Sequence, residues 1–177
     1  RECEVERKVV EAYIGILEDL LLAYRIPVFT KKAKRVQTQH PKFYFFDAGV
    51  FRALRPSGSL DKPEQIEGAA LEGLIAQHLL AWNAYQGGKN RLYFWRTPSG
   101  TEVDFIVYGK DIFWAIEVKN SQKVREEDLR VLKAFKTDYP QSKLFLVYRG
   151  KEKLLKEGIL CIPCEDFLKS LNFKAMP

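Results

Sequence analysis

The chain has 177 residues, of which 46% are hydrophobic and 13% aromatic, which is enough apolar surface for a folded core and excludes a wholly disordered chain. Its length suits one ordinary domain, or one domain plus a fragment of another, and its net charge of +6 suits an anionic partner without requiring one. No segment approaches the ~18 consecutive apolar residues of a membrane helix. No secretory signal is visible, so we expect a cytoplasmic protein and no membrane partner. Because the sequence opens at Arg1 and leads directly into a helix, we expect it to be the C-terminal piece of a longer chain.

The first 56 residues predict a helix followed by a β-hairpin. Apolar residues recur at helical spacing over residues 7–24, and residues 25–30 and 42–47 are typical of two strands. A helix followed by a hairpin with a basic tip resembles the second half of a winged helix, so we assign residues 1–56 to a partial winged-helix domain. We expect the tip of the hairpin to contact DNA phosphates, although a solvated loop is the alternative. The basic residues of this tip are Lys31, Lys32, Lys34 and Arg35.

A change in composition near Ser57, rich in Gly, Pro and Ser, marks the predicted start of a second domain, residues 57–177. In chain order, the pattern predicts a helix at 65–85, strands at 91–96, 101–108 and 112–120, a helix at 124–139, strands at 144–148 and 158–162, and a helix at 165–171. The resulting order, αβββαβ plus an appended strand and helix, predicts an α/β fold with a mixed sheet flanked by helices.

The second and third of these strands form a predicted hairpin that carries opposed acidic residues. The turn at 109–111 sets a register in which Asp104 lies opposite Glu117 and Glu102 lies opposite Lys119. Like charges directly opposite one another are destabilising, so the Asp104–Glu117 pair requires a cation, which is the geometry of a metal site. The alternative is that these residues form ordinary cross-strand ion pairs.

Strict alternation along the hairpin predicts which face each side chain takes. Val103, Phe105 and Val107 fall on one face, and Glu102, Asp104 and Ile106 fall on the other. In the next strand, Glu117 and Lys119 share a face opposite to Ile116 and Val118. On the preceding helix, Glu72 stands among Gly68, Ala69, Gly73 and Ala76, and we expect these small neighbours to let the helix approach the sheet and direct Glu72 across it.

The joint pattern of Glu72, Asp104 and the Glu117-Val118-Lys119 triplet on this element order resembles the PD-(D/E)xK nuclease superfamily, whose core is restriction-endonuclease-like. The chain most closely resembles the domain of unknown function at the C-terminus of many bacterial and archaeal AAA-type ATPases. In those proteins, a P-loop ATPase and a winged helix precede the module. The matching segments include residues 43–49 (FYFFDAG), 68–80, 94–107 and 115–121 (AIEVKNS). One departure is Val103, which stands where the superfamily has its namesake proline.

The resemblance implies a role for each site residue. Asp104 and Glu117 match the metal-binding pair, Glu72 matches the helix-borne acid, and Lys119 matches the positively charged active-site residue. Carboxylates suit Mg²⁺ or Mn²⁺, and the backbone carbonyl of Val118 offers a further hard oxygen ligand. The remaining candidates are Glu102, beside the ligands, and Arg96, which we also expect to contact nucleic acid.

The implied function is that of a magnesium-dependent phosphodiesterase acting on DNA, attached to an N-terminal AAA-type ATPase region. The alternative is a catalytically inactive nuclease-fold module that binds nucleic acid or protein and regulates the linked ATPase. The sequence contains no G-x-x-x-x-G-K-[ST] motif, so an ATPase site is not predicted in this segment. Cys161 and Cys164 are expected to be small packed residues rather than zinc ligands, and residues 93–95 to be strand core rather than a base-stacking surface.

Overall fold

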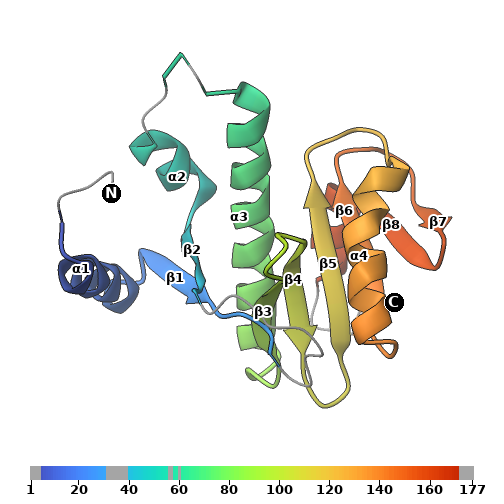
Figure 1. Cartoon of the computed structure of the whole chain (residues 1–177), viewed down its shortest axis with the longest axis horizontal. Helices are drawn as coiled ribbons and strands as arrows, with labels where there is room; N and C mark the ends of the chain where they lie inside the picture. The colour runs from blue at the N-terminus through green and yellow to red at the C-terminus, as the bar shows by residue number, and fades with distance from the viewer. Residues whose placement is uncertain (1–4, 31–39, 56–57, 60, 172–177) are drawn as a thin grey trace.

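The computed structural model describes residues 5–30, 40–55, 58–59 and 61–171. Its centre is a six-stranded sheet with the spatial order β3-β4-β5-β6-β8-β7. The strands are β3 (Arg91–Arg96), β4 (Glu102–Tyr108), β5 (Phe113–Lys119), β6 (Lys143–Tyr148), β7 (Leu154–Lys156) and β8 (Ile159–Pro163). The helices that flank the sheet are α3 (Pro63–Tyr85), α4 (Glu126–Asp138) and α5 (Cys164–Ser170). Figure 1 shows α3 and α4 on opposite sides of this sheet.

The sheet is mixed, as the sequence predicted. Strands β3, β4 and β5 are antiparallel neighbours, whereas α4 carries the chain from β5 to a parallel β6, and β8 is parallel to β6. Parallel neighbours require such a crossover, since a tight turn would reverse the chain. Residues 144–148 are buried along their whole length, as expected for a strand covered on both faces. The short edge strand β7 was not predicted from the sequence.

Two apolar cores lie on the two faces of the sheet. On the first face, α3 contributes Leu71, Ile75 and Leu79, and α5 contributes Phe167. On the second face, α4 contributes Leu129, Leu132 and Phe135. Neighbouring residues of β3 pack on opposite faces of the sheet. Phe94 lies in the first core and Trp95 lies in the second. The prediction that this strand belongs to the core is confirmed.

The N-terminal part consists of α1 (Arg7–Asp19), the antiparallel strands β1 (Ala23–Ile26) and β2 (Lys42–Phe45), and α2 (Ala48–Leu54). The predicted extension of the first helix to residue 24 is wrong. The backbone at Leu21 adopts a φ of 58°, which turns the chain into β1 after Asp19. The helix α2 was also not predicted; the side chain of Asp47 caps it by accepting hydrogen bonds from the backbone N–H groups of Gly49 and Val50. The predicted basic tip and the predicted boundary near Ser57 lie outside the described residues.

The segment after β1 attaches the hairpin to the edge of the main sheet. Phe94 donates its backbone N–H to Pro27 (3.1 Å), and Phe29 donates its own to Phe94 (2.7 Å). The Phe29 side chain is only 1% exposed. The rings around it are those of Tyr93, Tyr108, Phe113, Phe135 and Tyr139. These contacts place β2 beside α3.

A β-bulge in β4 changes the face on which its acidic side chains lie. Tyr93 pairs with Ile106, but Trp95 pairs with Val103, so the register shifts by one residue between the two pairs. Val103 and Ile106 therefore both pack in the α4-side core, whereas Phe105 packs in the α3-side core. The predicted strict alternation is wrong at this point, and the bulge is the physical reason. Consequently Asp104 faces α3 rather than α4.

Candidate active site

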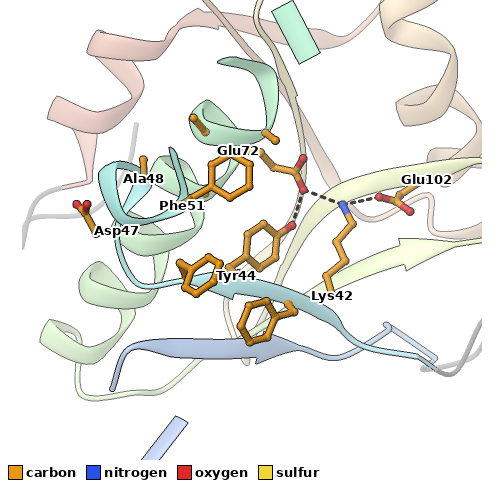
Figure 2. A pocket seen from close by; sticks show the side chains of 12 residues that line it. Lys42, Tyr44, Asp47, Ala48, Phe51, Glu72 and Glu102 are labelled. Atoms are coloured by element: carbon orange, nitrogen blue, oxygen red, sulfur yellow. Dashed lines mark hydrogen bonds and ion pairs between the residues drawn. The ribbon is translucent and has the colours of Figure 1, made fainter. Parts of the chain in front are cut away.

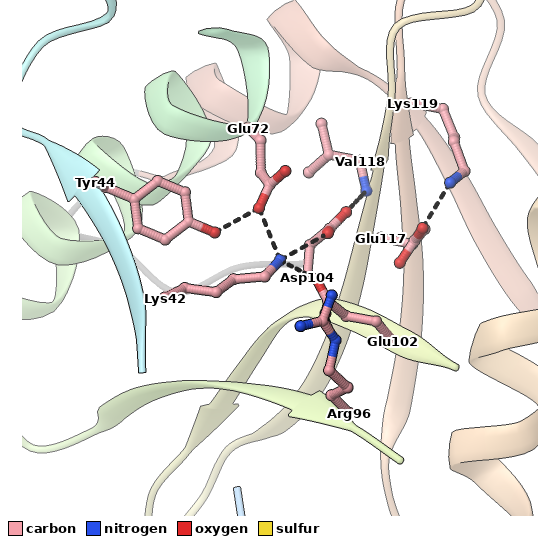
Figure 3. Close-up of polar contacts among 9 residues, drawn as sticks. All are labelled: Lys42, Tyr44, Glu72, Arg96, Glu102, Asp104, Glu117, Val118 and Lys119. Atoms are coloured by element: carbon pink, nitrogen blue, oxygen red, sulfur yellow. Dashed lines mark hydrogen bonds and ion pairs between the residues drawn. The ribbon is translucent and has the colours of Figure 1, made fainter. Parts of the chain in front are cut away.

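Polar side chains from four elements lie in two neighbouring groups where β2 and α3 pass the ends of β4 and β5, one around Lys42 and one formed by Glu117 and Lys119 (Figure 3). The residues involved are Lys42 and Tyr44 of β2, Glu72 of α3, Glu102 and Asp104 of β4, and Glu117 and Lys119 of β5. All four acids that the sequence singled out lie in this region. Lys42 and Tyr44 were not predicted.

Asp104 stands where β4 and β5 separate. The pairing of Phe105 with Ile116 follows the predicted register and is the last backbone pair of this ladder. Beyond it, the Asp104 carboxylate accepts a hydrogen bond from the backbone N–H of Val118 (Oδ2 to N, 3.0 Å). Strand β5 remains paired with β6 as far as Lys119. The Asp104 side chain thus replaces a strand partner and is held firmly against β5.

Lys42 places its ammonium among three carboxylates. Its Nζ lies 2.8 Å from Glu72 Oε1 and 3.2 Å from Asp104 Oδ1, and it also pairs with Glu102. The Lys42 side chain is only 18% exposed. Burial by itself would lower the pKa of Lys42, but Asp104, Glu72 and Glu102 outweigh that effect and raise the pKa. Lys42 is therefore a permanently charged cation inside the acidic cluster.

Tyr44 supports the same carboxylate that Lys42 contacts. Its hydroxyl donates a hydrogen bond to Glu72 Oε1, so one oxygen of Glu72 receives donors from both residues. Lys42 and Tyr44 are two positions apart in β2, and their side chains therefore lie on one face of the strand. This alternation was visible in the sequence, but nothing in it indicated that the face would meet Glu72.

Glu117 lies on the other side of β5 from Val118, as the sequence predicted. It is 4% exposed, and its Oε1 accepts a hydrogen bond from Lys119 Nζ at 2.6 Å. Its Oε2 is buried and has no hydrogen-bond partner among the described residues. A buried oxygen without a donor is costly. The backbone N–H of Asp104 also acts on the Glu117 carboxyl and favours the ionised form, that is, it lowers the pKa.

The predicted opposition of Glu102 and Lys119 is not formed. Glu102 pairs with Lys42 and Arg96, and Lys119 pairs with Glu117. The physical reason is that the β4–β5 ladder stops at Phe105, so the two strands diverge before they reach Glu102. The exposed Arg96, which the sequence offered as a nucleic-acid contact, directs its Nε to Glu102.

The two central acids resist ionisation. Burial, with the charge of Glu72 adding to it, raises the pKa of Asp104 to about 6, although Lys42 and the Val118 N–H oppose this shift. Burial and the charge of Asp104 likewise hold the pKa of Glu117 well above its ordinary value, against the opposing effect of Lys119. Asp104 faces α3, whereas Glu117 lies on the side of β5 opposite to Val118, which packs in the α3-side core. A cation in contact with either carboxylate would favour its ionised state.

The donor set fits a hard divalent cation in its chemistry. Carboxylate oxygens are the ligands that Mg²⁺ prefers, and Glu72, Asp104 and Glu117 supply them. However, within the described ranges no three His, Cys, Asp or Glu side chains are grouped closely enough to hold a metal ion. Lys42 stands among Glu72, Glu102 and Asp104, whereas Glu117 pairs with Lys119. A metal would be held by Asp104 and Glu117 together with Glu72 and the carbonyl of Val118.

A cavity of about 370 Å³ adjoins the site between β2, α2 and α3 (Figure 2). Aromatic side chains and small residues form most of its lining: Phe43, Tyr44, Phe45, Phe51, Ala48, Ala69, Ala70 and Gly73. Glu72, Lys42 and Glu102 belong to its polar part. The expectation that small residues bring α3 against the sheet holds for Ala76, which is fully buried, but Ala69 and Gly73 instead line this cavity.

The two C-terminal cysteines lie away from this site and have separate environments. Cys161 is buried in β8 and Cys164 is the first residue of α5, and both are free thiols. Burial raises the pKa of each thiol. Both residues therefore belong to the packing of the sheet and α5.

Comparison with known proteins gives a family but no established activity. The family model described as "Domain of unknown function (DUF4143)" matches residues 67–167, and that described as "Domain of unknown function (DUF8612)" matches residues 1–61. The uncharacterized proteins Mb2031c of Mycobacterium bovis and Rv2008c of Mycobacterium tuberculosis are each 26% identical to this chain over 173 residues. The match covers 95% of this chain and 37% of each relative, so the chain spans little more than a third of their length. No solved structure matches.

Among the described residues, none of the helices has both the length and the apolar character needed to cross a membrane.

The DUF4143 match extends from α3 to α5 and includes every acid of the site. It covers more than half of the chain. The chain therefore belongs to the DUF4143 family.

Proposed function

We propose that the chain carries a divalent-metal-dependent nuclease domain of the PD-(D/E)xK type, which hydrolyses phosphodiester bonds in DNA. The observation that carries the proposal is a pair of acids at the point where two central strands separate. Glu117 is buried and Asp104 is partly buried, and Lys119 contacts Glu117. The element order αβββαβ from α3 to β6 supports the same assignment. We also propose that the first 56 residues are part of a winged helix, in a cytoplasmic protein that contains an AAA-type ATPase region. The greater length of the curated relatives leaves room for such a region.

In this proposal each residue has a defined task. Asp104, Glu117, Glu72 and the Val118 carbonyl would hold Mg²⁺ or Mn²⁺. Such an ion, when bound, would supply a Lewis acid for activation of water and for charge stabilisation at the phosphorus. Lys119 holds the attacking water or a phosphate oxygen through its ammonium group. Arg96 is 46% exposed at its side chain and contacts the DNA backbone beside the site.

A cleavage assay on the full chain tests the proposal. Supercoiled plasmid and single- and double-stranded oligonucleotides are incubated with Mg²⁺ or Mn²⁺ and the wild type, Asp104→Asn or Glu165→Gln. Glu165 is an exposed residue of α5 paired with Lys169, so its variant is the matched control for loss of one carboxylate. We expect cleavage by the wild type and the control, and none by Asp104→Asn. Intact DNA in every reaction, or equal cleavage by Asp104→Asn, would refute the proposal.

A second candidate is a catalytically inactive nuclease-fold module that binds nucleic acid or protein and regulates the linked ATPase. The specific observation in its favour is that the cations of this chain already engage the acids: Lys42 pairs with three of them and Lys119 with the fourth. This candidate predicts a folded protein that takes up no Mn²⁺ in calorimetry. Heat of Mn²⁺ binding that disappears in Glu117→Gln would exclude it.

A further inference from the structure

Lys42 has a contact set that resembles the surroundings of a bound cation. Its Nζ meets Glu72 Oε1 at 2.8 Å and Asp104 Oδ1 at 3.2 Å, and it also pairs with Glu102 (Figure 3). All three carboxylate side chains are less than one quarter exposed. Three partly buried negative charges so close together are stable only with a cation among them, and in this chain that cation is an ammonium group.

We propose that Lys42 is an internal competitor of the divalent metal and the residue that sets the metal affinity of the site. This inference rests on the proposed function and names what regulates the same site. Lys42 is a positioning residue in this role, because it acts through the carboxylates. It holds Glu72 and Asp104 in place, and it leaves when the metal arrives.

Competition follows from the shared oxygens. Asp104 has one oxygen bound to the Val118 N–H, and the other, Oδ1, contacts Lys42. Mg²⁺ binds carboxylate oxygens at about 2.0–2.1 Å, so an ion on Oδ1 of Asp104 and Oε1 of Glu72 would meet the ammonium and be repelled by it. The two cations therefore exclude each other at these oxygens. Occupancy by one requires displacement of the other.

The competitor and the ligands come from different parts of the chain. Lys42 is the first residue of β2 and lies within the segment matched by the DUF8612 model, whereas the three acids lie within the DUF4143 match. The hairpin is anchored independently, because Phe29 is buried among aromatic rings of the main sheet, those of Tyr93, Tyr108 and Phe113. The flexible four-carbon stem of Lys42 can therefore swing out without unfolding β2. Because coupling between two binding events is reciprocal, a change that lifts Lys42 out would raise the metal affinity.

Calorimetric titration of Mn²⁺ into the full chain tests this inference. Lys42→Met keeps the apolar stem and removes the charge, and we expect it to bind Mn²⁺ at least tenfold more tightly than the wild type. Arg25→Met is the matched control. Arg25 lies on the neighbouring strand β1 and pairs with Glu11 and Glu18 on α1, so its loss should leave the Mn²⁺ affinity unchanged.

A second measurement needs no substitution. Reductive methylation followed by mass spectrometry reports the accessibility of each lysine ammonium in the wild type. Lys42 should be protected without metal and should become reactive when Mn²⁺ is added. The exposed Lys169, on α5, should react equally in both conditions.

The outcomes separate this inference from the proposed function. If the wild type binds Mn²⁺ but Lys42→Met binds it no more tightly, or if Lys42 stays protected with metal bound, competition is refuted and the nuclease proposal stands. If neither protein binds Mn²⁺, both proposals fall. Tighter binding by Lys42→Met together with metal-dependent labelling of Lys42 supports competition, whether or not DNA is cut.

Discussion

The Asp104 carboxylate accepts the backbone N–H of Val118 at 3.0 Å, at the position where β4 and β5 cease to pair through their backbones. A side chain here takes the role of a strand partner. The hydrogen bond fixes Asp104 relative to the stretch of β5 that carries Glu117 and Lys119. It leaves the second oxygen of Asp104 for a cation, which in the described structure is Lys42.

Two substitutions of Asp104 should distinguish the effect of its charge from the effect of its hydrogen bond to the Val118 N–H. Asp104→Asn keeps an oxygen that can accept the Val118 N–H, so we expect a folded protein whose Mn²⁺ affinity falls at least tenfold. Asp104→Ala also leaves that buried N–H without its partner, which costs a further ~1–3 kcal/mol of unfolding free energy. Calorimetry and urea unfolding measure the two effects. Equal stability of the two variants would contradict the structural role of the hydrogen bond.

The raised pKa of Asp104 predicts a pH dependence of stability. Because its folded-state pKa is about 6, above its ordinary 3.8, the folded protein holds this proton more tightly than the unfolded chain does. The protonated Asp104 carboxyl therefore contributes fully to the free energy of unfolding below about pH 4. This contribution, about 2–3 kcal/mol in total, is lost as the pH rises through 6. The amide in Asp104→Asn cannot ionise, so this variant should not lose unfolding free energy in this way as the pH rises. Urea unfolding of both proteins from pH 4 to pH 8 should show the wild type losing stability relative to the variant, and a gain would contradict the account.

Removal of the Lys119 charge should destabilise the protein through Glu117. Lys119→Met leaves the buried Glu117 without its cation, and we expect a loss of about 2–4 kcal/mol near pH 8. The double variant Glu117→Gln, Lys119→Met should recover much of that loss, because no unpaired charge then remains. Chemical unfolding of the two single variants and the double variant gives the coupling free energy. Additive effects would show that the two residues do not act as a pair.

Phe29 should be essential for stability although it belongs to the N-terminal segment. Its ring is 1% exposed within the α4-side core, so Phe29→Ala is expected to cost about 3–5 kcal/mol. Leu155→Ala, at a position 74% exposed in β7, is the control and should change stability by less than about 0.5 kcal/mol. Thermal unfolding of both variants checks this prediction. A small effect at Phe29 would mean that the N-terminal segment does not contribute to the core.

Local patterns in the sequence were sufficient to locate five of the six strands of the central sheet. The buried run at 144–148, the helical spacing before Pro140 and the turn after Tyr108 each reflect a period or a turn signal that the fold preserves. The same local register placed Asp104 next to the triplet that starts at Glu117. The helix α2 and the strand β7 are short, and their patterns are too brief to stand out in the sequence.

The details of the site could not be predicted because they depend on contacts between distant segments. The bulge in β4 adds one residue to the strand, and its effect on the direction of Asp104 is invisible to an alternation rule. Lys42 meets Glu72 and Asp104 across 30 and 62 positions of sequence. Only the packing of β2 beside α3, secured in part by Phe29, brings them together.

The most direct test of the proposed metal centre is an anomalous difference map from crystals of the full chain soaked in Mn²⁺. We predict a single strong peak in contact with Asp104 and Glu117, with the Lys42 ammonium displaced from Glu72 and Asp104. The absence of a peak at these carboxylates, with Lys42 still paired to them, would contradict the metal centre.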